Sequence, residues 1–228
     1  MNCLNVSPCM RTVCAMVLAV CVASLFLGGC AHDEEGVKPA QEMFDEAQAL
    51  ARKKSVEKAS EAFMQVRTYY PSHDLARMAL LATADLYYDN EDYESALKNY
   101  QEFRLLYPTD AEAGRCLYRI GMCHFQQMGT FDRDQSQTSR AIQSLDAFLK
   151  TYPDSPHAED AALKLKEART LLARHDHSIG RFYLKKGNHK AACARFTAVK
   201  RQYPDVTLED DIDALILQAC TSGPAAKE

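Results

Sequence analysis

The chain is poor in the residues that interrupt helices, with only 9 Gly and 8 Pro among 228 residues, and it has no Trp. Because Gly and Pro dominate turns, their scarcity favours long helices over a turn-rich β structure. The aromatic volume comes instead from 11 Tyr and 9 Phe. Neither sign of charge is in large excess, since 27 Lys and Arg stand against 31 Asp and Glu. This balance gives no indication of a nucleic-acid partner.

Sequence motifs of enzymes are also missing. The chain has no nucleophile elbow, P-loop, Rossmann glycine fingerprint or zincin motif, and its carboxylates form no recognisable acid–base pair. One candidate metal motif, His175-Asp176-His177, is unfavourable because successive helical residues point about 100° apart, which places the two histidines on different sides. We therefore expect a binding protein without catalytic residues, metal ligands or a cofactor.

Cysteines are unevenly distributed, since five of the nine lie within the first thirty residues. Two of the later ones, Cys116 and Cys123, are seven residues apart on one predicted helix, which separates them by roughly 10 Å. That distance is too long for a disulfide. We interpret these two, together with Cys193 and Cys220, as small buried hydrophobic residues and not as a disulfide framework.

The N-terminus has the layout of a secretory signal. An uncharged apolar run from Thr12 to Leu27 ends in Leu27-Gly28-Gly29-Cys30. A membrane-spanning helix needs about 20 apolar residues, and here Asp33-Glu34-Glu35 follows almost at once. The sequence therefore predicts a signal peptide over residues 1–29.

A Cys directly after small residues resembles a bacterial lipobox, in which the thiol is acylated and becomes the mature N-terminus. This resemblance predicts a covalent lipid on Cys30 and a linker over residues 30–39. Ala31 after the lipidated Cys is compatible with sorting to the outer membrane in such lipoproteins, so we expect a lipid-anchored protein on the periplasmic face of that membrane.

The rest of the chain repeats one pattern four times, with identical steps of four, three and five residues. The first two steps place a small residue and two large ones on one helical face. The Pro after the Tyr then ends the helix, because Pro cannot continue the hydrogen-bond ladder. The four copies are Ala59, Phe63, Val66, Tyr70-Pro71; Ala96, Tyr100, Phe103, Tyr107-Pro108; Ala141, Leu145, Phe148, Tyr152-Pro153; and Ala192, Phe196, Val199, Tyr203-Pro204.

A second small residue precedes the Ala by twelve positions in three copies, as Ala47, Ala84 and Gly180. In the third copy its counterpart is Gly121, which requires an eight-residue insertion within residues 129–137. A small residue there lets two helices of a hairpin approach closely. The period is that of tetratricopeptide repeats, and it predicts an all-α fold, an α-solenoid of helical hairpins over residues 40–220.

The end of the chain is expected to differ from the four copies. A single helix from Leu208 to Ala219 would open a fifth hairpin and cap the solenoid. We expect residues 221–228 to form a disordered tail.

Several segments resemble the BamD family, the tetratricopeptide lipoproteins of the outer-membrane β-barrel assembly machinery. The resemblance covers nearly the whole mature chain, but the family normally completes five hairpins. Its most specific feature is the Asp-Arg-Asp insertion. The segments are Phe131-Asp132-Arg133-Asp134-Gln135-Ser136-Gln137-Thr138, Tyr152-Pro153-Asp154-Ser155, Ala158-Glu159-Asp160-Ala161 and Gly180-Arg181-Phe182-Tyr183.

The resemblance implies an outer-membrane protein assembly factor that binds unfolded β-barrel precursors and docks the POTRA region of the core barrel subunit, beside other assembly lipoproteins. Arg195 matches the family's docking arginine. Two alternatives remain. One is a lipoprotein that coordinates cell-envelope or pilus and secretin assembly. The Asp-Arg-Asp insertion argues against this alternative. The other is a passive envelope spacer, for which a featureless charged groove would be expected. We expect no nucleic-acid partner.

Two surfaces are candidates for binding. The first is a stripe beside the packing stripe of each hairpin's first helix, which we predict to line a groove for precursor peptides, although such residues also suit an ordinary core. This stripe contains Leu81, Asp85 and Tyr88, then Tyr118, Met122 and Phe125, and in the first hairpin Phe44, Gln48 and Ala51.

The second surface is basic. Seven Lys and Arg and no acid lie between His177 and Pro204. A solvated helix face is one interpretation, and an acidic protein patch or an anionic lipid is the other. We predict that Arg195, Arg181 and Lys185 dock the core subunit. The seven are Arg181, Lys185, Lys186, Lys190, Arg195, Lys200 and Arg201.

Overall fold

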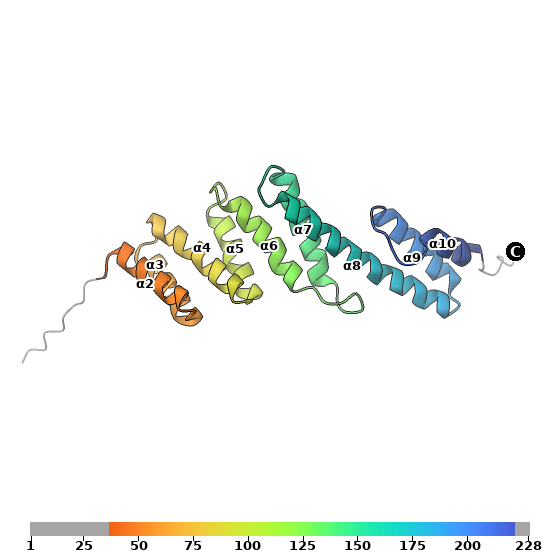
Figure 1. Ribbon diagram of the computed structural model, residues 1–228, viewed down its shortest axis with the longest axis horizontal. Coiled ribbons are helices and arrows are strands. Elements are labelled where there is room, and N and C mark those ends of the chain that lie inside the picture. Colours follow the sequence, from red (N-terminus) through yellow and green to blue (C-terminus); the bar gives the residue numbers. More distant parts are fainter. Residues whose placement is uncertain (1–36, 222–228) are drawn as a thin grey trace, which may run out of the picture. The chain divides into compact units, whose positions relative to one another are not determined.

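The computed structural model describes residues 37–221, which form helices joined by turns and contain no strand (Figure 1). The predicted signal peptide, Cys30 and residues 222–228 lie outside the described residues. Between residues 37 and 221 no helix has both the length and the apolar character needed to cross a membrane. The helices are α2 (Ala40–Arg52), α3 (Val56–Tyr69), α4 (Asp74–Asp89), α5 (Tyr93–Leu106), α6 (Ala113–Gln126), α7 (Ser136–Thr151), α8 (Ala158–Lys185), α9 (His189–Gln202) and α10 (Ile212–Thr221).

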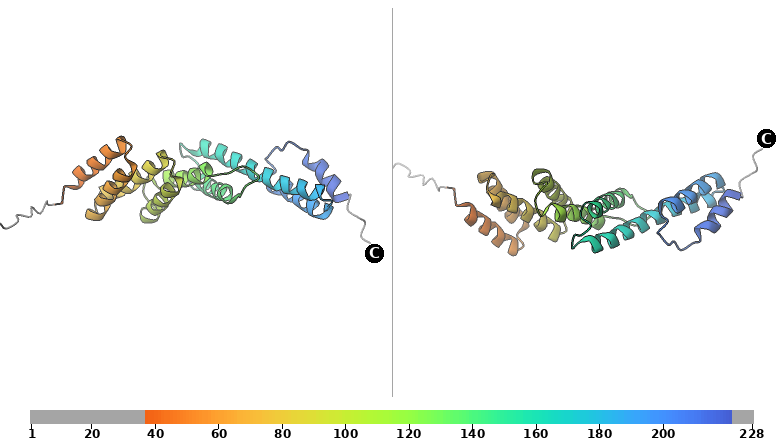
Figure 2. Two further views of the ribbon diagram at one scale, coloured as in Figure 1. Left: turned by 90° about the horizontal axis from the view of Figure 1, so that it is seen from below. Right: turned by 90° about the horizontal axis from the view of Figure 1, so that it is seen from above.

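The helices form hairpins in chain order, because each packs mainly against the helix before it and the helix after it (Figure 2). We call α2, α4, α6 and α8 the leading helices and α3, α5, α7 and α9 the trailing helices of the four hairpins. The last helix, α10, packs against α9. The all-α solenoid of helical hairpins predicted from the repeat is confirmed.

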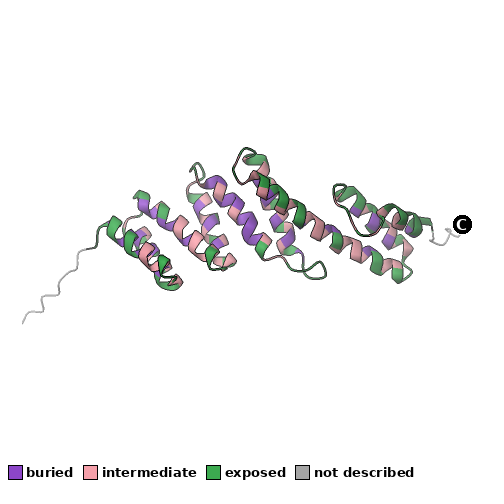
Figure 3. Cartoon of the chain, in the orientation of Figure 1, coloured by how far each residue is buried: buried purple, intermediate pink, exposed green. Residues whose placement is uncertain are grey.

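The repeated stripe forms the core of every trailing helix. Ala59, Ala96, Ala141 and Ala192 have no exposed surface, and the two large side chains after each of them are at most 2% exposed. Buried positions recur accordingly along each of these helices in Figure 3. Because full burial of one large apolar side chain is worth about 1.5–3 kcal/mol, this stripe is a principal source of stability.

The trailing helices also end alike. Each stops one residue before the Tyr of its Tyr-Pro pair, and the four Tyr have φ between −132° and −127° and ψ between 54° and 60°. A residue before Pro is driven out of the helical region by contact with the proline ring. The Tyr amide still donates to the carbonyl four residues earlier, which closes the last turn. The predicted helix ends are therefore confirmed.

The small residues of the leading helices allow close approach, as expected. A Cβ added to Gly180 would lie 2.5 Å from Phe196 Cε1, and one added to Gly121 would lie 2.8 Å from Leu145 Cδ2. Both distances are shorter than real contacts, so a larger residue at either position would force the facing side chain to shift.

The connections from one hairpin to the next share a side-chain cap. His73, Asp110 and Ser155 each stand three residues after the Tyr of Tyr-Pro. Each side chain accepts a hydrogen bond from the amide two residues later, over 3.1, 2.8 and 3.3 Å respectively. Such bonds satisfy amides that a helix start leaves unpaired, and they start the next helix promptly.

The fourth copy has no such cap, because Val206 occupies the corresponding position. The helix predicted from Leu208 accordingly begins later, at Ile212, and extends to Thr221. Its start is capped by Asp211, whose Oδ1 accepts from the amides of Asp213 at 2.9 Å and Ala214 at 3.3 Å. The predicted start was wrong because a carboxylate at the right place is available only at Asp211.

Helix α8 has 28 residues, whereas the other helices have between 10 and 16. Its Ala161 packs in one core cluster with Phe148, and its Gly180 faces Phe196 in the next. The sequence carries a signal for this length in its spacing. Fourteen residues separate Tyr107 from Gly121, but twenty-eight separate Tyr152 from Gly180.

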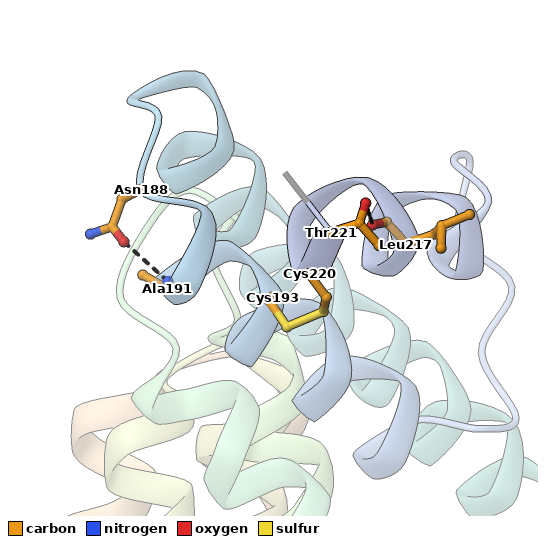
Figure 4. Close-up of a disulfide and its surroundings, with 6 residues drawn as sticks. All are labelled: Asn188, Ala191, Cys193, Leu217, Cys220 and Thr221. Carbon is orange, nitrogen blue, oxygen red and sulfur yellow. Dashed lines mark hydrogen bonds between the residues drawn. A yellow bond between two sulfur atoms is a disulfide. The ribbon is translucent and has the colours of Figure 1, made fainter. Parts of the chain in front are cut away.

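Cys193 of α9 and Cys220 of α10 form a disulfide with a Cα–Cα distance of 5.0 Å (Figure 4). The interpretation of these two cysteines as reduced core residues is therefore wrong. They are 27 residues apart in sequence and meet only because α10 folds back onto α9. Cys116 and Cys123 are free and buried, as predicted, and burial raises the pKa of both thiols to about 12.

Candidate binding surfaces

A cavity of about 580 Å³ lies between α2, α3 and α4. Three residues of the predicted groove stripe line it, namely Gln48, Ala51 and Asp85. Its lining combines apolar side chains with charges of both signs, which suits an extended segment of alternating polarity. The remaining lining residues are Arg52, Lys54, Val56, Phe63, Ala82, Leu86, Asp89 and Asn90.

Asp85 is the centre of a polar network on this face. Its Oδ1 accepts from Tyr100 Oη at 2.6 Å, and its two oxygens accept from the Arg115 guanidinium at 2.8 and 3.1 Å. The hydrogen bond to Asp85 is the main reason why the pKa of Arg115 is raised. Burial is the main reason why the pKa of Tyr100 is raised. An ionised carboxylate has about four acceptor positions, so Asp85 is held in place and retains little capacity for a ligand.

A positively charged side chain of the protein lies over each of the two accessible aromatic rings of the groove stripe. The Arg119 guanidinium lies 4.2 Å from the ring centroid of Tyr88, and Lys164 Nζ lies 5.0 Å from that of Phe125. Both rings are half-buried, as is Leu81 beside them. A cation over a ring is held by the electrostatics of the ring face. The two sites can therefore offer an aromatic edge and a positive charge together.

Tyr118 and Met122 do not line a groove, because they are only 8% and 6% exposed and pack in the core with Phe148. The start of the long α8 covers this part of α6. Tyr118 Oη donates to Asp160 Oδ2 at 2.5 Å, and its ring stacks on His157 at 4.6 Å. The expectation that these two residues face a ligand is wrong.

Phe44 of the first hairpin is likewise 4% exposed and packs on Phe63. Of the whole predicted stripe, the structure thus brings Gln48, Ala51 and Asp85 together in one cavity. It also leaves part of Leu81, Tyr88 and Phe125 accessible.

The predicted basic surface is only partly available. Arg195 and Lys185 are exposed, and Arg195 forms no ion pair with any residue that the structure describes. Arg181, however, pairs with Asp210. Lys200 pairs with Asp213 at 2.5 Å.

These carboxylates were missed in the sequence although a signal was present. Five acids follow the acid-free basic stretch within ten residues, namely Asp205, Glu209, Asp210, Asp211 and Asp213. A basic stretch followed at once by an acidic one predicts a contact between them whenever the chain reverses direction, and the α9–α10 connection does so.

His175 and His177 contact different segments. His175 Nδ1 lies 2.6 Å from the carbonyl oxygen of Phe131 in the α6–α7 loop. His177 Nε2 lies 3.3 Å from Asp210 Oδ2, and burial lowers the pKa of this histidine. Among residues 37–221 no group of three or more His, Cys, Asp or Glu side chains is placed to hold a metal ion.

Comparisons with known proteins agree on one family. The YfiO family, described as an outer membrane lipoprotein, matches residues 37–221. The outer membrane protein assembly factor BamD of Caulobacter vibrioides is 33% identical over 141 residues, which are 62% of this chain but only 46% of that protein. BamD of Rickettsia prowazekii is 29% identical over 82% of this chain and 76% of its own length. BamD of Vibrio cholerae is 28% identical over 81% of each chain.

Proposed function

Because the chain belongs to the YfiO family of outer membrane lipoproteins, we propose that it is an assembly factor for outer-membrane β-barrel proteins, anchored by a lipid on Cys30. The observation that carries this proposal is that the family matches the same residues that form the hairpins, while relatives named as assembly factors match more than four fifths of the chain. Stable anchoring would require at least two acyl chains, because one chain gives only marginal membrane binding. The mechanism is binding and positioning.

Unfolded barrel precursors are the proposed ligands of the groove. A barrel strand alternates apolar and polar side chains, and the cavity between α2, α3 and α4 is lined by both apolar and charged side chains. Within residues 37–221 no sheet edge is available for strand addition, so recognition must act through side chains. The accessible parts of Tyr88 and Phe125, each beside a cation, provide aromatic contacts with the ligand.

A double substitution tests the groove. We expect Tyr88→Ala with Phe125→Ala to weaken binding of a precursor peptide with a C-terminal aromatic residue about tenfold, since an aromatic pair adds roughly 0.5–1.5 kcal/mol beyond burial. Fluorescence anisotropy with a labelled peptide measures the affinity, and circular dichroism monitors helicity. The matched control is Tyr69→Ala, an exposed Tyr at the end of α3. Equal affinity of the double variant and the wild type would show that Tyr88 and Phe125 do not contribute to precursor binding.

Docking of the POTRA region of the core barrel subunit is assigned to the basic surface of α9 and the end of α8. Arg195 and Lys185 are exposed there. Arg195 is exposed and does not belong to the buried Ala192-Phe196-Val199 stripe, so its replacement should leave the core intact. A charge pair that is broken at one end in a desolvated interface costs about 2–5 kcal/mol.

The experiment is affinity purification from detergent-solubilised envelopes. We expect a POTRA-bearing barrel protein to co-purify with the wild type and to be lost with Arg195→Glu. The matched control is Lys58→Glu, which reverses an exposed charge on α3. Unchanged recovery of the barrel protein with Arg195→Glu would refute the docking assignment.

A further inference from the structure

The acidic segment Leu208–Asp213 lies against cations of α8 and α9. Asp210 pairs with Arg181 and approaches His177 Nε2 to 3.3 Å. Glu209 lies 3.9 Å from Arg174. The contact thus joins carboxylates of the α9–α10 connection to one surface of α8.

The contact is incomplete and held weakly. A cavity of about 360 Å³ remains between the segment and α8, lined on one side by Leu208, Glu209 and Asp210. The side chain of Glu209 is 90% exposed and that of Arg181 is 58% exposed. Ion pairs between such exposed groups stabilise little, because water screens them.

The wall of this cavity contributed by α8 carries unused binding capacity. His177 Nε2 is buried and makes no hydrogen bond, although Asp210 Oδ2 lies 3.3 Å away. Phe131 of the α6–α7 loop lines the same cavity and is 43% exposed. The surface therefore combines two arginines, a buried histidine nitrogen and an exposed aromatic ring.

We propose that this surface of α8, formed by Arg174, His177 and Arg181, binds an acidic segment of a partner protein. The chain's own Leu208–Asp213 occupies the surface until that partner arrives. The segment itself indicates the chemistry that fits, an apolar residue followed by two carboxylates. This inference rests on the proposed function, since Arg181 belongs to the predicted docking residues.

Exchange is possible without unfolding the end of the chain. The Cys193–Cys220 disulfide holds α10 on α9, so the connection between these helices can open while α10 stays in place. A tethered segment acts at an effective concentration on the order of millimolar. Tethering therefore lets even this weak contact compete with a free partner, and removing the charge of the segment should expose the surface.

The test uses a labelled synthetic peptide with the sequence of residues 206–213 and the full chain. We expect Glu209→Gln with Asp210→Asn to bind this peptide at least tenfold more tightly than the wild type does. Adding Arg174→Gln and Arg181→Gln to that variant should abolish the gain. The matched control, Glu61→Gln with Asp154→Asn, removes two charges from exposed or partly exposed sites elsewhere and should bind like the wild type.

Equal affinity of the wild type and the double variant would overturn the inference, as would a gain that survives loss of both arginines. If the double variant loses helicity, the single variant Asp210→Asn replaces it in the peptide-binding measurement, and the same two outcomes would overturn the inference. If the peptide-binding test fails but the barrel protein no longer co-purifies with Arg195→Glu, the further inference is refuted and the proposed function is supported. Retention of the barrel protein by Arg195→Glu with a positive result here would refute the docking assignment alone.

Discussion

Leading and trailing helices of the same hairpins bury their residues differently. The trailing helices α3, α5 and α9 each bury only three residues, all on the repeated stripe. The leading helices α4 and α6 bury six and ten residues, on more than one face. The remaining helices α2, α7 and α8 bury four residues each. Trailing helices therefore repeat one simple packing rule, whereas the inner leading helices α4 and α6 combine packing on two sides with the face proposed to bind ligands.

This difference explains which predictions failed. One stripe accounts for every buried residue of a trailing helix except Thr138 of α7, so these buried residues and the helix end at Tyr-Pro follow from the sequence. A second stripe on a leading helix is either surface or core, depending on what covers it. Tyr88 stays half-exposed whereas Tyr118, at the start of the same stripe in the next hairpin, is covered by His157 and Asp160 of the α7–α8 connection and α8.

The largest loss of stability is expected from a substitution on the repeated stripe of a trailing helix. Phe103→Ala should lower the free energy of unfolding by about 3–5 kcal/mol, because it empties a fully buried site. Leu81→Ala, on the half-buried groove stripe of α4, should lower it by only about 1 kcal/mol. Urea unfolding followed by circular dichroism measures both. Similar losses would remove the distinction between the two kinds of helix.

A smaller loss of stability is expected where a leading helix contacts the repeated stripe of its trailing helix. Gly180→Ala should cost about 1–3 kcal/mol, because the new methyl group would meet the Phe196 ring and force it to shift. Gly114→Ala is the matched control, since its added Cβ would lie 3.2 Å from the Tyr152 ring, and helix propensity favours Ala by about 1 kcal/mol. The urea concentration at the midpoint of unfolding should fall clearly more in Gly180→Ala than in Gly114→Ala. Equal shifts would show that close approach at Gly180 is unimportant.

The smallest effect concerns pH. His124 of the leading helix α6 is 5% exposed, and burial lowers its pKa, while its Nδ1 lies 2.8 Å from Gln137 Oε1. As pH falls below the unfolded value of about 6.5, the unfolded chain takes up the proton first, so the free energy of unfolding decreases until the folded His124 also titrates.

Thermal unfolding at pH 7.5 and pH 5.5 checks this expectation. His124→Gln should reduce the difference in melting temperature between the two pH values, and the remainder should reflect His177, whose pKa is also lowered by burial. The trailing stripes contain only Ala, Phe, Tyr, Leu and Val and should add nothing in this range. A pH difference as large in His124→Gln as in the wild type would contradict the assignment.

Other features differ in how well the sequence predicts them. The length of α8 was readable, because the Tyr152–Gly180 spacing is twice that of the other copies. The late start of α10 depended on which of several acids caps it, and only the backbone selects Asp211. The Cys193–Cys220 pair could not be found by spacing, since no local rule relates two cysteines on different helices.

The length of α8 has a mechanical consequence. At 1.5 Å per residue, its 28 residues make a rod of about 42 Å. One end is embedded in the core cluster of the third hairpin through Ala161, and the other end in the terminal cluster through Gly180 and Tyr183. A helix without an internal break resists bending and twisting, so α8 acts as a lever arm. A pull or a torque that a bound protein exerts on α9 would be transmitted along it to the hairpin that carries Phe125.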